Sequence, residues 1–316
     1  MGDLKDHFRG ALLGNIAGDV LGAPLEGMSF HFAKKKGPVR EIIPSSRGQG
    51  RYTDDTQLMI GLAEALCETP GRPDLDRVAF HFGDNYEPER GYGGNTHGIL
   101  SMIQRGHDWR KVVEDHSLPG GSFGNGSAMR VSPVALALYP DPHSVAKAAD
   151  EQSKVTAHHH PISLVGTRLQ ALAVLRGLVR GSKGEEFDGK GFISEFICGG
   201  AEEYRDRLEW IAENLKAGPE KAAEKLGTGV AAIDSVPAAL WSFLSTSDAE
   251  EAIVRAINLG GDTDTIGAMA GAIAGAYYGA SGLPARWTDN MENEAKGKDY
   301  VIKLADALYA HQAKKP

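Results

Sequence analysis

The chain has 316 residues, 41% of them hydrophobic, and a formal net charge of −8 at pH 7. This length can bury a large core and no linker interrupts it, so we expect one domain over residues 1–316. The acidic balance argues against sequence-specific binding of nucleic acid. Cys67 and Cys198 lack CxxC spacing, which predicts neither a disulfide framework nor a zinc site.

The sequence predicts a protein without a targeting or membrane segment. Residues 1–7 carry charge where a signal peptide would need an apolar core. The apolar runs are short and are broken by glycine or charge, so no membrane span is expected. We therefore expect a cytoplasmic protein, and we expect it to be a monomer.

Apolar residues recur at helical spacing along most of the chain, and proline or glycine marks nearly every junction. Residues 39–43 come nearest to a strand, which would be isolated, and residues 181–191 are typical of an exposed, mobile loop. The sequence therefore predicts an all-α fold, a single compact, orthogonal domain of many helices. The predicted helices cover residues 6–22, 55–68, 74–86, 95–105, 127–138, 143–153, 162–180, 191–197, 203–215, 219–226, 236–244, 248–258, 264–278 and 298–312.

Two predicted helices are dense in small residues, one over residues 10–22 and one over residues 267–279. Each interior glycine costs about 1 kcal/mol relative to alanine, so their number implies a packing reason. Glycine on a helix face lets another helix approach closely. Asp19 in the first helix, and Asp262 and Asp264 beside the second, argue for tight packing in a soluble core rather than in a membrane.

Two short runs each combine two carboxylates with two hydroxyls at the start of a helical pattern: residues 53–56 (TDDT) and residues 262–265 (DTDT). One such run could be only a helix N-cap. Four acids gathered closely would repel one another unless cations lay among them, and hard divalent ions such as Mg²⁺ prefer oxygen ligands. Gly260 and Gly261 would let the second run turn tightly. We therefore predict one metal site, assembled between helices from both runs.

The segment from Gly120 to Gly126 (GGSFGNG) opens an apparent helix, so its backbone N–H groups could face an anion. Phe123 offers a ring for stacking on a ligand. Glycine-rich turns are commonly only turns, and no Gly-Lys-Ser/Thr follows that would make this a P-loop. The residues alone leave phosphate binding and a simple turn both open.

Three consecutive histidines, His158, His159 and His160, do not predict a metal site, because consecutive side chains point in different directions. A single histidine that hydrogen-bonds a ligand is the better hypothesis. Glu26 precedes a stretch rich in glycine, lysine and proline that runs to about residue 50. A carboxylate there could be a metal ligand, a gate or surface charge, and the residues alone favour surface charge.

Taken together, these motifs resemble the ADP-ribosylglycohydrolase superfamily. The resemblance covers residues 10–287, nearly the whole chain. It is carried by two acidic motifs, YTDDTQLM and LGGDTDTIGAMAGAIAGAYYG, in order around a central GGSFGNGSAMRVSP. GALLGNIAGDVLGAPLE, RGYGGNTHGIL, the His158 segment and AIDSVPAALWSFL also match.

The resemblance implies an all-α fold around a binuclear site with two Mg²⁺ ions, Mn²⁺ being an alternative. The implied metal ligands are Glu26, Thr53, Asp54, Asp55, Asp262, Asp264 and Thr265. Asp54 and Asp55 would be catalytic, holding metal and water with one of them as general base, and Glu26 would be a catalytic gate. The implied substrate-binding residues are Gly120, Gly121, Ser122, Phe123, Gly124, Asn125, Gly126, His158 and Val230. Ala157 stands where relatives often carry threonine, so the matching histidine could be His159 instead.

The implied activity is hydrolysis of the N- or O-glycosidic bond between ADP-ribose and a modified protein side chain, releasing ADP-ribose. The partner would be an ADP-ribosylated protein or an ADP-ribose-containing small molecule. Residues 120–130 and 230–237 are most similar to the branch that acts on O-linked ADP-ribose, as on serine or in poly(ADP-ribose). An arginine-directed hydrolase stays open. So do two other classes, a non-catalytic ADP-ribose-binding or crystallin-like structural protein and a Mg²⁺-dependent phosphohydrolase.

Overall fold

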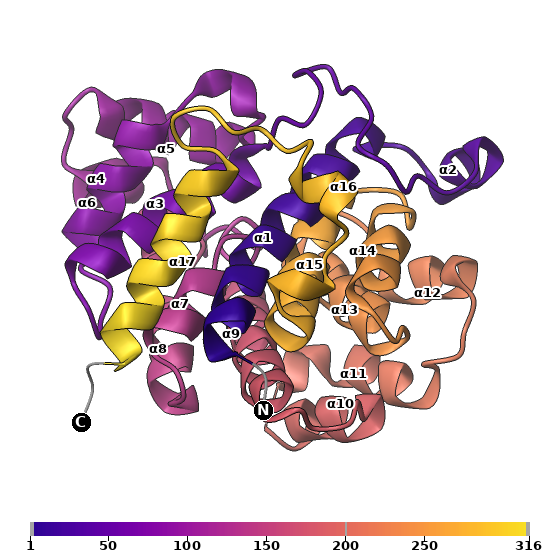
Figure 1. Ribbon diagram of the computed structural model, residues 1–316. Coiled ribbons are helices and arrows are strands. Elements are labelled where there is room, and N and C mark those ends of the chain that lie inside the picture. The colour runs from indigo at the N-terminus through magenta and orange to yellow at the C-terminus, as the bar shows by residue number, and fades with distance from the viewer. Residues whose placement is uncertain (1–2, 200, 314–316) are drawn as a thin grey trace.

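The computed structural model describes residues 3–199 and 201–313. These residues form 17 α-helices and five short 3-10 helices, with isolated bridges but no strand, which confirms the predicted all-α class (Figure 1). The helices are α1 (Leu4–Gly22), η1 (Ala23–Leu25), α2 (Phe30–Lys36), α3 (Asp54–Glu68), α4 (Leu75–Asn85), η2 (Pro88–Arg90), α5 (Gly94–Gln104), α6 (Trp109–His116), α7 (Ser132–Ala137), α8 (Pro142–Ser153), η3 (Lys154–Thr156), α9 (Pro161–Lys183), α10 (Gly189–Cys198), η4 (Glu202–Tyr204), α11 (Arg205–Glu213), α12 (Pro219–Leu226), α13 (Ala232–Leu244), α14 (Ala249–Ile257), α15 (Thr263–Tyr278), η5 (Ala280–Gly282), α16 (Ala285–Thr288) and α17 (Lys298–Ala313).

The glycine-dense helices α1 and α15 lie side by side at the centre of the fold and run in opposite directions (Figure 1). Gly14 faces Gly271, and a β-carbon built on Gly14 would lie 2.1 Å from the carbonyl oxygen of Gly271. A β-carbon on Gly18 would lie 1.9 Å from the carbonyl oxygen of Gly267. The expected close packing is therefore present. It brings the end of α1 that carries Asp19 next to the N-terminus of α15.

Gly14→Ala is expected to destabilise the fold by roughly 1–3 kcal/mol, because the added methyl group forces the two backbones apart. Gly98 in α5 is a matched control, since a β-carbon there meets no heavy atom within 4 Å. Gly98→Ala should be neutral or stabilise by up to about 1 kcal/mol. Urea-induced unfolding of both variants measures the difference, and equal effects would contradict glycine-mediated contact between α1 and α15.

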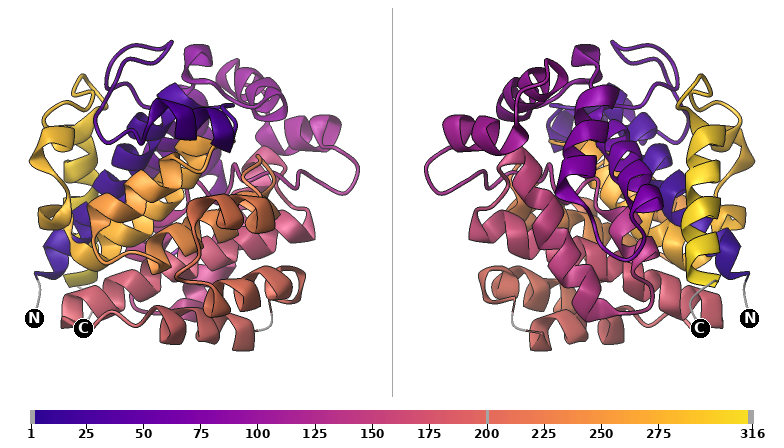
Figure 2. Two further views of the ribbon diagram at one scale, coloured as in Figure 1. Left: turned by 90° about the vertical axis from the view of Figure 1, so that its right-hand side faces the viewer. Right: turned by 90° about the vertical axis from the view of Figure 1, so that its left-hand side faces the viewer.

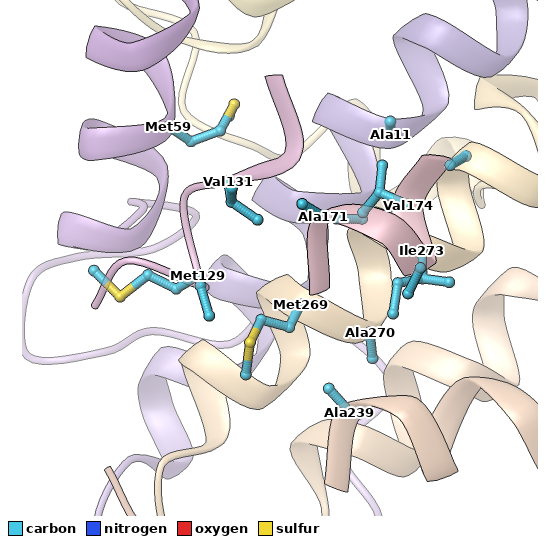
Figure 3. Close-up of a cluster of buried hydrophobic side chains, with 14 of the residues drawn as sticks. Ala11, Met59, Met129, Val131, Ala171, Val174, Ala239, Met269, Ala270 and Ile273 are labelled. Carbon is cyan, nitrogen blue, oxygen red and sulfur yellow. The ribbon is translucent and has the colours of Figure 1, made fainter. Parts of the chain in front are cut away.

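Other helices pack around this central pair. Figure 3 shows Ala171 and Val174 of α9 with Ala270 and Ile273 of α15, all buried. On the other side of α1, Arg9 pairs with Asp306 of α17 (2.6 Å). As a result α1 begins and α17 ends at the same end of the molecule (Figure 2).

α9 is the one helix among the described residues that is long and apolar enough to cross a membrane, contrary to the expectation that every apolar run is too short. Within the fold, 67% of its apolar window is buried. The helix also buries polar side chains, and Gln170 Nε2 donates to the carbonyl oxygen of Met269 (2.9 Å). In this structure α9 is therefore a core helix.

The apolar pattern predicts the wrong start for two helices that contain proline, α7 and α13. The pattern predicts a helix over residues 127–138, yet residues 127–130 form turns and α7 begins at Ser132. Pro133 lies in the first turn, where its missing N–H and fixed φ are tolerated. By contrast, α13 begins at Ala232, four residues before the predicted start, and continues through Pro237. The pattern also misses α2, α6 and α16, which have 7, 8 and 4 residues.

Residues 39–43 do not form a strand. Val39 N–H donates to Asn258 Oδ1 (2.9 Å), and the Val39 carbonyl oxygen accepts from Asn258 Nδ2 (3.0 Å). A side-chain amide thus pairs where a neighbouring strand would. The loop predicted over residues 181–191 is shorter than expected, because α9 continues to Lys183 and α10 begins at Gly189.

A polar network joins α3 to α4 and to the C-terminal segment. The Glu64 carboxylate accepts from Asn85 Nδ2 (2.7 Å), Lys296 Nζ (2.7 Å) and Tyr300 Oη (2.6 Å). Burial alone would raise the pKa of Glu64, but hydrogen bonds from His81, Lys296, Tyr300 and Asn85 lower it to about 2. The ionised form of Glu64 therefore stabilises the contact among these three parts of the chain.

Because its folded pKa lies below the ordinary 4.5, Glu64 stabilises the fold above about pH 4.5 and loses that contribution as the pH falls toward 2. Glu64→Gln should lower the free energy of unfolding by roughly 3 kcal/mol at pH 7 and by clearly less at pH 3. Urea-induced unfolding at the two pH values tests this. An equal loss at both would contradict the assigned ionisation.

Candidate active site

The first acidic run lies at the N-terminus of α3. Thr53 is the N-cap residue, and its hydroxyl oxygen accepts from the Asp55 N–H (3.3 Å). The same hydroxyl donates to Asp55 Oδ2 (3.1 Å), while the buried Asp55 Oδ1 has no hydrogen-bond partner in the described part of the chain. The cap thus fixes Asp55 and leaves one of its oxygens available to a ligand.

Asp19 of α1 holds this run in place. It is fully buried and accepts from the Thr53 N–H (3.0 Å), the Thr56 N–H (3.1 Å) and the Thr56 hydroxyl (2.6 Å). Burial raises the pKa of Asp19 to about 6, and the bonds from Thr56 and Thr53 oppose that rise. Sequence reasoning assigns Asp19 no place in the site. The sequence feature that could have indicated its role is a lone acid in an apolar, glycine-rich helix. Such an acid is expected to be buried, and a buried charge needs hydrogen-bond partners.

The second acidic run follows a tight turn at Gly260 and Gly261. Their φ angles of +78° and +77° lie in the left-handed region that glycine adopts freely, as the sequence predicts. The Gly261 N–H donates to the Met28 carbonyl oxygen (2.7 Å), and the Asp262 N–H donates to the Thr228 carbonyl oxygen (2.8 Å). Three loops therefore meet where α15 begins.

Both runs line one pocket of about 280 Å³. A larger cavity of about 430 Å³ lies between α2, α12 and α14, but no predicted site residue lines it. The smaller pocket is therefore identified as the site by the chemistry of its lining residues, and not by its volume. The predicted residues that line the pocket are Glu26, Asp54, Asp55, Ser122, Gly124, Asn125, Gly126, His158, Val230, Asp262, Asp264 and Thr265.

Burial and neighbouring negative charge raise the pKa of three carboxylates in this pocket, Asp54, Asp55 and Asp264. Burial, followed by the negative charges of Asp19 and Asp262, raises the pKa of Asp54 to about 8. Burial and the charges of Asp19 and Asp54 raise the pKa of Asp55 well above its ordinary value. Burial with the charges of Asp55 and Asp262 does the same to the pKa of Asp264. Such repulsion favours a bound cation.

The donor set fits a hard divalent cation. Carboxylate and hydroxyl oxygens line the acidic part of the pocket, and no lysine or arginine in the described residues lines it. The unpaired Asp55 Oδ1 is an acceptor that a cation would satisfy. Within residues 3–199 and 201–313, no three acidic, histidine or cysteine side chains converge closely enough to hold an ion as they stand. A metal would have to draw the acids together.

Glu26 follows η1 and lines the pocket with its side chain 43% exposed. Its carboxylate pairs with the guanidinium group of Arg47 (3.4 Å). Arg47 lies against Gly91, where a β-carbon would come within 2.1 Å of Arg47 Nη2. Glu26 is thus part of the pocket rim and has a defined partner, unlike an isolated surface charge.

The segment from Gly120 to Gly126 restrains the second acidic run. The Asn125 N–H donates to the Val230 carbonyl oxygen (3.0 Å), which ties the segment to the loop before α13. The Asn125 side chain donates through Nδ2 to Asp262 Oδ2 (2.6 Å). A glycine-rich loop and an acidic run that are far apart in sequence are thereby held at one place.

His158 lies buried beside this loop. Its Nδ1 is 2.9 Å from Thr156 Oγ1, and Arg130 Nη2 donates to the same hydroxyl (2.9 Å). Burial and the positive charge of Arg130 lower the pKa of His158 to about 3, so the ring is neutral. A β-carbon on Gly126 would lie 2.8 Å from His158 Nε2, so this nitrogen faces the loop. His159 does not line the pocket, which favours His158 as the implied histidine.

Four predicted residues do not line the pocket: Thr53, Gly120, Gly121 and Phe123. Thr53 is occupied by capping, and the two glycines serve the turn, with φ angles of +79° and +84°. Phe123 is 52% exposed, and its ring lies edge-on to His160 with the ring centroids 6.2 Å apart. Any stacking on Phe123 therefore takes place at the surface, outside the pocket.

The pocket also has a wall that sequence reasoning leaves out of the site. Gly91 and residues 93–96, at the start of α5, line it together with Met129. The available signal is the glycine-rich run GYGG immediately before a helical pattern, which has the same character as the segment from Gly120 to Gly126. Periodicity alone marks such a run only as a helix boundary.

Comparison with known proteins assigns the chain to a class. The family model for ADP-ribosylglycohydrolase matches residues 1–316. The chain belongs to the ADP-ribosylglycohydrolase family and is a glycosyl hydrolase, which sets aside the structural-protein and phosphohydrolase alternatives.

Individual relatives cover nearly the whole chain. ADP-ribosylhydrolase ARH3 of Bos taurus is 33% identical over 96% of this chain and 92% of its own length. ADP-ribosylarginine hydrolase Tri1 of Serratia proteamaculans is 26% identical over 96% of this chain and 79% of its own length. A solved structure described as an ADP-ribosylglycohydrolase-related protein complex has a TM-score of 0.77 and 29% identity, over 98% of this chain and 99% of that one.

Proposed function

We propose that this hydrolase releases ADP-ribose from a modified protein side chain by breaking its glycosidic bond, with Mg²⁺ as cofactor and an O-linked side chain as leaving group. One observation carries the proposal. A single pocket joins buried carboxylates from two distant runs to the glycine loop around Asn125 and to the neutral His158. One part suits metal-assisted chemistry, and the other, where glycines let the backbone approach a ligand closely, suits the diphosphate of ADP-ribose.

The acidic part of the pocket would hold two Mg²⁺ ions, which supply Lewis-acid polarisation of the ribose hydroxyls and of a water molecule. The residues that would hold them are Glu26, Asp54, Asp55, Asp262, Asp264 and Thr265, all of which line the pocket. Asp54 or Asp55 would accept a proton from the attacking water. The bond that breaks joins the anomeric carbon to the side-chain atom, through an oxocarbenium-like transition state.

The glycine loop would provide binding energy away from the reacting atoms. Gly124 and Gly126 line the pocket without side chains, so a diphosphate can approach their backbone. Asn125 links this loop to Asp262 (2.6 Å), so a ligand bound to the loop would lie at a fixed position relative to the acids. That position would orient the anomeric carbon for attack.

One side chain that could form a wall for an arginine leaving group is engaged elsewhere, which supports O-linkage. Tyr92 donates its hydroxyl to Gln57 Oε1 (2.5 Å) and does not line the pocket. The relative named as an arginine hydrolase is also the less similar, at 26% identity against 33% for the bovine relative.

Side-by-side assays on serine-linked and arginine-linked ADP-ribosyl peptides test the leaving group. We expect faster release from serine, and a tenfold preference corresponds to about 1.4 kcal/mol in the transition state. Release that is faster from arginine by the same factor would overturn the O-linked assignment and leave the hydrolase assignment intact.

Chelation tests the metal. Excess EDTA is expected to abolish release of ADP-ribose, and Mg²⁺ should restore it better than Zn²⁺, because the acidic part of the pocket offers oxygen ligands. Full activity in excess EDTA would remove the metal from the proposal.

A further inference from the structure

The helix α5 starts in the pocket without a cap. Its N-cap residue is Gly93, which has no side chain to accept from the first turn. The His97 N–H donates to the Gly93 carbonyl oxygen (2.8 Å), but the N–H groups of Gly94, Asn95 and Thr96 have no acceptor in the described part of the chain. Gly93 and Gly94 are exposed, so water or a ligand in the pocket can accept from these N–H groups.

Two side chains at the same place also lack partners. Thr96 is only 8% exposed and lines the pocket, yet its hydroxyl makes no hydrogen bond within the described residues. Asn95 also lines the pocket, and its buried Nδ2 has no acceptor there. A β-carbon on Gly93 or Gly94 would meet no heavy atom within 4 Å, so there is open space beside the backbone of these two residues. The backbone N–H groups can only donate, whereas the Thr96 hydroxyl can donate or accept. The unpaired N–H groups therefore favour an oxygen-rich or anionic ligand atom.

This donor wall, formed by residues 93–96, lies beside the first acidic run. Tyr92, which leads into it, is bonded to Gln57 of α3 (2.5 Å). Gly91, one residue earlier, packs against Arg47, the partner of Glu26. The wall is therefore anchored at the acidic part of the pocket, where the proposed reaction takes place, whereas the glycine loop is anchored to Val230 through Asn125.

We propose that the donor wall receives the oxygen of the departing side chain and stabilises the negative charge that develops on it. This rests on the proposed function. As the bond from the anomeric carbon to that oxygen breaks, its electron pair stays on the oxygen, where the α5 amides and the Thr96 hydroxyl donate to it. A water molecule supplies the new hydroxyl group of ADP-ribose. The remaining proton of that water molecule ends on the released side-chain oxygen.

The same wall discriminates between leaving groups. A serine oxygen offers lone pairs to N–H and O–H donors. A guanidinium group offers only N–H donors and carries positive charge, so it would face the unpaired backbone N–H groups and the positive end of the α5 dipole. The wall therefore favours O-linked over arginine-linked substrates, because mismatched donors stay unsatisfied.

Thr96→Val tests this, with Thr96→Ser as the matched variant that keeps the hydroxyl. Each is assayed with Mg²⁺ on a serine-linked ADP-ribosyl peptide and on 4-nitrophenyl ADP-ribose, whose nitrophenolate departs without help. Thr96→Val should lower kcat on the peptide about tenfold or more, with KM within about twofold, and should change turnover of the nitrophenyl substrate by less than about threefold. Thr96→Ser should restore most of the peptide activity. Calorimetric binding of ADP-ribose should be unchanged, which also shows that the variant is folded.

Four results would overturn the inference. They are a Thr96→Val enzyme as active as the wild type, equal losses on both substrates, a change confined to KM, or a tenfold weaker affinity for ADP-ribose, which would assign the wall to the ADP-ribose moiety. If the wild-type enzyme releases ADP-ribose from neither substrate, the proposed function itself fails. That outcome is separate from a Thr96→Val enzyme that works as well as the wild type, which refutes the donor wall alone.

Discussion

Asp262→Asn is expected to weaken Mg²⁺ binding and to lower kcat/KM by more than the roughly 10- to 100-fold that loss of a second-shell partner costs. Asp262 lines the pocket and is held by Asn125 (2.6 Å), and its charge raises the pKa of both Asp54 and Asp264. The substitution removes one of the negative charges that attract the cation and keeps the size of the side chain.

Calorimetric titration with Mg²⁺, followed by steady-state kinetics, measures both effects. Asp289→Asn is the control, because Asp289 is exposed and lies outside the pocket. An inactive Asp262→Asn enzyme with unchanged Mg²⁺ affinity and stoichiometry would show that Asp262 has a role other than metal binding.

Asp19→Ala is expected to lower the free energy of unfolding by about 3 kcal/mol or more and to abolish activity. The substitution leaves the Thr53 N–H, the Thr56 N–H and the Thr56 hydroxyl without an acceptor at a fully buried position. Removing the charge also relieves repulsion of Asp54 and Asp55. The lost hydrogen bonds dominate because three donors are left unsatisfied at once.

Asp19→Asn separates the two effects, since it keeps one acceptor oxygen and should cost less stability than alanine. Asp206→Ala, at an exposed position on α11, should stay within about 0.5 kcal/mol of the wild type. Urea-induced unfolding compares the three variants. If Asp19→Ala is as stable as Asp206→Ala, Asp19 does not hold the first acidic run.

Much of the fold follows from local sequence. The glycines of α1 predict that another helix approaches it closely, because their number in a helix has no local benefit, and the structure shows that this helix is α15. The bounds of α7 and α13 cannot be predicted from local sequence. Proline is tolerated in the first turn of a helix, as Pro133 is in α7, and also inside a helix where packing supports it, as Pro237 is in α13.

The site also contains some residues that the sequence predicts and others that it does not. The two acidic runs and the Asn125 loop are compact motifs, so the sequence predicts them, and the fold places them in one pocket. Asp19 and Thr96 belong to no motif. Asp19 matters because it accepts hydrogen bonds from residues distant in the chain, and Thr96 because its hydroxyl is left for a ligand. A single sequence shows neither kind of partner.

Identification of the products tests the central claim most directly. The enzyme is incubated with a serine-linked ADP-ribosyl peptide and Mg²⁺, and the products are analysed by mass spectrometry beside a sample with excess EDTA. We expect intact ADP-ribose and unmodified peptide with Mg²⁺, and no release with EDTA, because the acids and the glycine loop of one pocket act together on the glycosidic bond. Release of AMP or phosphate, or recovery of the unchanged conjugate, would contradict that claim.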